Sequence, residues 1–93
     1  MRVLIIGYTQ RNAYAEFKEY VQNRRHFTNG QYIENEQRFV SDSGVTVEYM
    51  GLTQHRKDGL SQYKAVYASP LALKYMKPSD LDWIQSLMIM GGN

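Results

Sequence analysis

The fold of this chain is decided by residues 2–9, which read RVLIIGYT. Four apolar residues follow Arg2 and lead to Gly7. A continuous apolar run, as opposed to an alternating one, is typical of a strand that is covered on both faces, as in the centre of a parallel sheet. Thr9 is a residue type that caps helices. We therefore expect a buried strand over residues 2–7 that leads directly into a helix.

An amphipathic helix is expected from Gln10 to about Arg25. Residues that form one apolar stripe recur there at three- and four-residue spacing, and polar residues mostly surround that stripe. The stripe consists of Ala13, Phe17, Tyr20, Val21 and Arg24. The chain then breaks at Asn29-Gly30.

A β region is expected over residues 32–50. A strand at 37–41, a turn at 41–44 and a strand at 45–50 indicate a hairpin. In the second strand, Val and Tyr alternate with Thr, Glu and Met, which predicts a half-buried strand. If residues 32–40 are extended, Glu34 and Glu36 share one strand face. Their charges then keep an edge of the sheet in water and discourage pairing with another strand.

The C-terminal third is expected to add one strand and two helices. Residues 64–68 read as a mostly apolar strand after a polar loop. Ser69-Pro70 has the residue types of a cap and a first helical position, for a short helix over 70–77. Ser79 is expected to cap a last helix that ends at Gly91-Gly92.

The order strand, helix, hairpin, strand, helix predicts a small α/β domain over residues 1–93, with helices packed on a layered sheet. The strands 2–7 and 64–68 are the best candidates for a parallel central pair. A chain of 93 residues has room for one domain. Since it contains no cysteine, it has neither a disulfide framework nor a thiolate metal site, and the fold depends on its core.

Composition sets limits on location and partners. The sequence has no apolar run near the roughly 20 residues of a membrane span, and Val3–Ile6 is too short for the core of a signal peptide. We expect a cytoplasmic protein without membrane contact. A net charge of +2 is far from the dense basic stripe of a duplex-DNA binder, so it permits nucleic-acid contact without requiring it.

One pattern occurs twice. Gly7-Tyr8-Thr9-Gln10-Arg11 follows the first strand, and Gly51-Leu52-Thr53-Gln54-His55-Arg56 follows the second hairpin strand. If these strands are parallel in one sheet, both loops lie at its carboxyl edge, where open α/β sheets bind ligands. A helix start at Thr9 also favours an anion. The candidate ligand-binding residues are Thr9, Gln10, Arg11, Thr53, Gln54 and Arg56. The alternative is coincidence, with Thr9 as a cap and Gly51 as a strand terminator.

Patterns of catalytic and phosphate-binding sites are absent from the sequence. It contains no G-x-x-x-x-G-K-[ST] loop, no second loop glycine after Gly7 and no G-x-S-x-G elbow. His26 and His55 have no nearby carboxylate cluster of metal-site spacing. We therefore expect no cofactor and no metal, and we assign no catalytic residue.

Two segments carry a resemblance to a known group of proteins. Residues 3–13, VLIIGYTQRNA, run from an apolar strand through a threonine turn into an alanine-containing helix, and residues 58–67, DGLSQYKAVY, place Gly-Leu before a strand. Together they resemble the strand–helix–strand core of the ATPases of helicases and phage terminases. Ala68-Ser69 stands where that family has Asp-Glu. The resemblance thus implies a fragment of the architecture without its phosphate loop and acidic pair.

Two basic clusters lie among the tyrosines. Arginine with exposed tyrosine is typical of single-strand binding, because rings stack on bases and guanidinium groups meet phosphates. It is equally typical of protein interfaces. The candidate nucleic-acid-binding residues are Arg24, Arg25, His55, Arg56 and Lys57. The alternative is that the tyrosines lie half-buried at the margin of a small core and that the basic residues form a face exposed to solvent.

The last expected helix is apolar nearly all round over residues 83–90. One face of a terminal helix is normally exposed to solvent and polar. Apolar residues on that face therefore indicate a self-association surface. The candidate interface residues are Trp83, Leu87, Ile89 and Met90. The alternative is that the hairpin sandwiches the helix or that its end frays.

Three functions are consistent with these patterns. The leading hypothesis is a small, non-catalytic accessory or regulatory module that acts through protein contacts, with a homodimer as one form. The second is nucleic-acid binding through the basic and tyrosine surface. The third is a phosphate- or nucleotide-binding enzyme that uses the two Gly-x-Thr-Gln loops.

Overall fold

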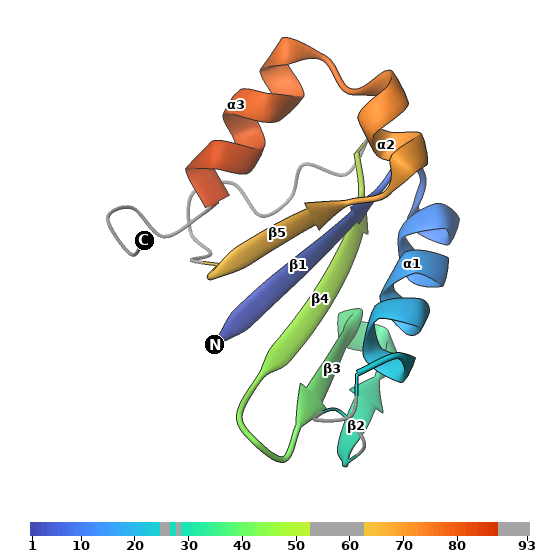
Figure 1. Cartoon of the computed structure of the whole chain (residues 1–93), viewed down its shortest axis with the longest axis vertical. Helices are drawn as coiled ribbons and strands as arrows, with labels where there is room; N and C mark the ends of the chain where they lie inside the picture. Colours follow the sequence, from blue (N-terminus) through green and yellow to red (C-terminus); the bar gives the residue numbers. More distant parts are fainter. Residues whose placement is uncertain (25–26, 28, 53–62, 88–93) are drawn as a thin grey trace.

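Strand β1 (Arg2–Gly7) runs inside a five-stranded sheet in the computed structural model, which describes residues 1–24, 27, 29–52 and 63–87 (Figure 1). β4 (Thr46–Gly51) and β5 (Ala65–Ala68) pair with β1 in parallel, one on each side. The α/β class and the parallel pairing of the first strand with the strand near 64–68 are therefore confirmed. The sequence did not predict β4 as the second parallel neighbour.

Two antiparallel strands complete the sheet. β2 (Gly30–Ile33) pairs with β3 (Arg38–Ser41), which pairs with β4, so the strand order is β2-β3-β4-β1-β5. The predicted hairpin is thus confirmed as β3 and β4. A single 3₁₀ turn, η2 (Glu34–Glu36), separates β2 from β3. Residues 32–40 are therefore not extended throughout, and the condition under which Glu34 and Glu36 would share a strand face is not met.

Helices cover both faces of the sheet. α1 (Gln10–Gln22) packs on one face, where its Phe17 belongs to the same apolar cluster as Val3 and Ile5 of β1. α2 (Pro70–Tyr75) and α3 (Pro78–Leu87) pack on the other face, against the alternate β1 side chains Leu4 and Ile6. The unbroken apolar run of β1 follows from this burial on both sides.

β4 is buried on both faces as well. Val47 and Tyr49 join the cluster under α1, whereas Met50 joins the cluster on the opposite face. Even Glu48 is only 3% exposed. The prediction of a half-buried strand is therefore wrong, because the polar positions of the alternating pattern point into a second core and not into water.

Most helix ends follow the predicted caps. The Thr9 hydroxyl accepts a hydrogen bond from the backbone N–H of Asn12, and Ser69 caps α2 through Ala72, with Pro70 at the start of the helix. These caps are confirmed. α1 ends at Gln22, earlier than predicted.

The start of α3 differs from the prediction. α3 begins at Pro78, and the backbone N–H of Lys77 donates to the Asp80 carboxylate at 2.9 Å. The prediction that Ser79 caps this helix is wrong, because Pro78 already occupies the first helical position. Gly91-Gly92 lies outside the described residues. Among the residues that are described, every helix is too short or too polar to cross a membrane.

Candidate functional site

The two repeated loops begin side by side at the carboxyl edge of the sheet. Gly7 and Gly51 are register partners in the parallel β1–β4 pair, and the backbone N–H of Leu52 donates to the Gly7 carbonyl oxygen at 2.8 Å. The premise that both strands run the same way is thus confirmed. The ligand hypothesis itself stays a prediction, since its residues Thr53, Gln54 and Arg56 lie outside the described residues.

The glycines of this repeated pattern have a packing role. A Cβ atom on Gly7 would lie 2.1 Å from the backbone nitrogen of Ala13, and one on Gly51 would lie 2.8 Å from that of Gln10. Real Cβ atoms do not approach backbone atoms this closely, so α1 can rest on both strand ends only because they are glycine. This close packing explains why both loops begin with glycine, and the explanation needs no ligand.

A single amide ties the starts of α1 and α2 together. The Asn12 Oδ1 atom accepts from the backbone N–H of Tyr8 at 2.9 Å and from the Ser69 hydroxyl at 2.6 Å. Thr9 is engaged as the cap of α1, whereas Gln10 and Arg11 are exposed on its first turn. Asn12 was not among the predicted site residues, although an amide three positions after a cap is a recognisable signal for such a contact.

An exposed apolar surface adjoins this edge. The Tyr8 ring stacks on the Tyr75 ring with 4.8 Å between centroids, and Leu71, Leu73 and Tyr75 of α2 are all exposed. We call Tyr8, Leu71, Leu73 and Tyr75 the α2 surface. The interface predicted from the sequence lies on the last helix instead, since the six residues of α2 are too few for periodicity to identify its outer face.

The predicted interface on the last helix can be placed only at Trp83. This side chain is half-buried and packs with Ile84 against the second core cluster. The Leu87 side chain, Ile89 and Met90 lie outside the described residues. Self-association through this helix therefore stays a prediction.

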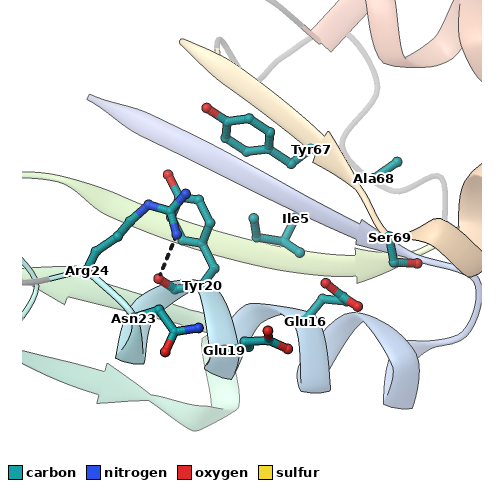
Figure 2. Close-up of a pocket in the computed structure, with 9 residues that line it drawn as sticks. All are labelled: Ile5, Glu16, Glu19, Tyr20, Asn23, Arg24, Tyr67, Ala68 and Ser69. Atoms are coloured by element: carbon teal, nitrogen blue, oxygen red, sulfur yellow. Dashed lines mark hydrogen bonds between the residues drawn. The ribbon is translucent and has the colours of Figure 1, made fainter.

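A cavity of about 180 Å³ lies between α1 and β5 (Figure 2). The Arg24 guanidinium lies 3.6 Å from the Tyr20 ring centroid and donates to the Tyr20 carbonyl oxygen. The lining residues are Ile5, Glu16, Glu19, Tyr20, Asn23, Arg24, Tyr67, Ala68 and Ser69. Arg24 thus shares this cavity with two carboxylates that repel phosphate. The other four predicted nucleic-acid-binding residues, Arg25, His55, Arg56 and Lys57, lie outside the described residues, so that function stays a prediction.

The half-buried Tyr20 and the buried Tyr49 make stability sensitive to alkaline pH. Burial raises the pKa of Tyr20, although the charge of Arg24 opposes the shift, and burial raises that of Tyr49 with a further contribution from the charge of Glu34. In the unfolded chain, tyrosine loses its proton near pH 10. Because the folded pKa is the higher one, the stabilisation is complete below about pH 10 and is lost as the pH rises through the folded value.

We therefore expect the free energy of unfolding to fall from about pH 10 upward, and the fall to be shallower in the double variant Tyr20→Phe/Tyr49→Phe. Urea unfolding between pH 8 and pH 11, followed by circular dichroism, measures both slopes. Equal slopes in the wild type and the double variant would contradict the assignment to these two tyrosines.

Comparisons with known proteins found no relative. A scan of the chain against protein-family models gave no match, and searches of curated proteins and of solved structures gave none either. The resemblance to helicase and terminase ATPases therefore stays a prediction, and a function has to be argued from the geometry above.

Proposed function

We propose that this chain is a non-catalytic binding module that docks an apolar segment of another protein on the α2 surface. One observation carries the proposal: of the seven exposed large apolar side chains among the described residues, four lie on α2 or stack against it. Leu73 is 60% exposed, and Leu71, Tyr75 and Tyr8 are exposed as well. Gathered exposed apolar side chains of this kind mark protein interaction sites.

The fold of the domain does not need these side chains to be apolar. Ala72 is the buried residue of α2, and the cap at Ser69 fixes the start of the helix. Leu71 and Tyr75 are four residues apart and share one flank of α2, whereas Leu73 lies on the other flank. Full burial of a leucine against a partner contributes about 1.5–3 kcal/mol, so a partner that covers both flanks gains a useful affinity.

The charges beside this surface indicate the partner's chemistry. Lys74 is exposed on α2 with its Nζ atom 5.5 Å from the Tyr75 ring centroid, and Lys77 is exposed just beyond the helix. Opposite charge steers association and selects among partners. The complementary partner segment is therefore apolar with acidic residues at its margins.

A displayed library of random peptides tests this proposal. We expect selected peptides to combine apolar and acidic residues, and the double variant Leu71→Gln/Leu73→Gln to weaken their binding at least about tenfold, which corresponds to about 1.4 kcal/mol. Calorimetric titration measures the affinities. The matched control is Leu81→Gln, which makes the same change at an exposed leucine of α3, and it should leave the affinity unchanged.

Two results would contradict the proposal. One is that the selected peptides bind equally well to the α2 double variant. The other is that light scattering shows a dimer that Leu71→Gln/Leu73→Gln dissociates, because a second copy of the chain would then occupy the surface in place of another protein.

A further inference from the structure

The cavity between α1 and β5 is separate from the α2 surface in residues and in chemistry. α1 lies over β1 and β4, so none of the helices that the structure describes covers the edge strand β5 on this face. Tyr67 of β5 is 49% exposed as a result. Ile5 of β1 lies between α1 and β5 and lines the apolar base of the cavity (Figure 2).

The electrostatics of this cavity favour a cation. Glu16 and Glu19 are three residues apart, which places both carboxylates on the same flank of α1. Neither carboxylate forms an ion pair within the described residues.

Among the described residues that line the cavity, Arg24 is the basic one, and it keeps its charge but is held at one end. Arg24 lies against the Tyr20 ring, at the end of the cavity opposite Ser69 (Figure 2). Its Nη1 atom donates to the Tyr20 carbonyl oxygen at 3.2 Å. Glu16 lies toward Ser69, away from Arg24 (Figure 2).

An aromatic pair forms a second recognition element, independent of the carboxylates. The rings of Tyr20 and Tyr67 come from elements far apart in the sequence, and their centroids are 5.6 Å apart. Such rings pack against methylene groups and attract ammonium groups through their faces. At about 180 Å³ the cavity is smaller than the roughly 300–1,000 Å³ of ordinary ligand sites, so a nucleotide is too large for it and one short chain fits.

From these observations we propose that the cavity binds an alkylammonium group. Glu16 and Glu19 receive the ammonium, and the alkyl chain lies along Ile5, Tyr20 and Tyr67. A free diamine and a lysine side chain of a protein share this chemistry, and the experiment below distinguishes the two sources.

The test is a titration of the ¹⁵N-labelled chain, followed by amide chemical shifts. The probes are n-butylamine, putrescine and Nα-acetyl-lysine methylamide, with n-butanol as the neutral analogue. We expect the amines to shift amides of residues 16–24 and of β5, and n-butanol to bind at least about tenfold more weakly, since it lacks the charge. Tighter binding of putrescine indicates a free diamine, and tighter binding of the lysine derivative indicates a protein side chain.

Variants locate the binding site. Glu16→Gln/Glu19→Gln should weaken amine binding at least about tenfold, whereas Glu34→Gln, the same change at an exposed glutamate of η2, should alter it less than about twofold. Tyr67→Leu keeps the cavity apolar but removes the ring that packs along the alkyl chain, and it should weaken binding severalfold. Unchanged circular dichroism shows that each variant is folded.

The proposal is overturned if the wild type binds none of the amines, if n-butanol binds as tightly as n-butylamine, or if the glutamate double variant retains full affinity. Because none of these variants alters the α2 surface, such a failure leaves the proposed protein-binding function standing.

Discussion

Replacing Gly7 by valine is expected to lower the free energy of unfolding by about 3 kcal/mol or more. A Cβ atom at this position would lie 2.1 Å from the Ala13 nitrogen and 2.4 Å from its Cα atom. Both are backbone atoms in the first turns of α1, so no side-chain rotation relieves the overlap. The helix must lift from the sheet, and lifting opens the core around Phe17 and Val3.

Gly44 provides the control for this substitution. It has a positive φ of 92° in the turn between β3 and β4, and a Cβ atom there would meet nothing within 4 Å. Gly44→Ala therefore changes only how readily the backbone adopts a positive φ, and it should lower the free energy of unfolding by only about 1 kcal/mol. Urea unfolding followed by circular dichroism measures both variants. A Gly7→Val protein no less stable than Gly44→Ala would show that α1 does not need this close contact.

The sequence predicted those parts of the fold that depend on neighbouring residues. The apolar run before Gly7, the caps at Thr9 and Ser69 and the turn before β4 are local signals, and the structure confirms them. The placement of β4 beside β1 depends on a pairing between segments more than 40 residues apart, as in Arg2 opposite Thr46. No local pattern carries that information, and the burial of Glu48 depends on it.

The α2 surface and the cavity were not predicted from the sequence, for the same reason. Exposure of Leu71 and Leu73 is decided by which side of α2 meets the sheet, and here Ala72 fills that side. The cavity requires Tyr20 and Tyr67 to converge from α1 and β5. The repeated loops were recognised from sequence because glycine at both strand ends is visible in the residues themselves.

Glu48→Ala is expected to have the second large effect on stability, a loss of about 3 kcal/mol. The Glu48 Oε2 atom accepts hydrogen bonds from Arg2 Nε at 2.9 Å and Nη2 at 2.7 Å, and Oε1 accepts from the Tyr63 hydroxyl at 2.8 Å. Burial acts against the charge of Arg2, yet the hydrogen bond and charge of Glu48 outweigh it and raise the pKa of Arg2. Removing the carboxylate leaves a buried hydroxyl and a half-buried guanidinium without this acceptor.

The size of this loss follows from where each partner lies. Glu48 is almost completely buried, but 41% of the Arg2 side chain remains exposed, so water solvates part of the guanidinium once its partner is gone. The expected loss is therefore at the lower end of the roughly 3–5 kcal/mol typical of a broken buried pair. Glu48→Gln keeps an acceptor for Tyr63 and should cost less, about 1–2 kcal/mol. Glu36→Gln, which disrupts the surface pair with Arg38, should cost under about 1 kcal/mol.

The triple variant Arg2→Met/Glu48→Leu/Tyr63→Phe separates charge from packing. It replaces every member of the network by an apolar side chain of similar size, and such replacements of buried ion pairs are often neutral. We expect it to recover most of the stability that Glu48→Ala loses, as measured by urea unfolding at pH 7. Because Leu fills the space of Glu48, a triple variant as unstable as Glu48→Ala would show that the ion pair and hydrogen bonds themselves supply the lost stability. Recovery would mean that Glu48→Ala is unstable mainly because it leaves Arg2 and Tyr63 without their acceptor and leaves a cavity, and not because the ion pair adds net stability.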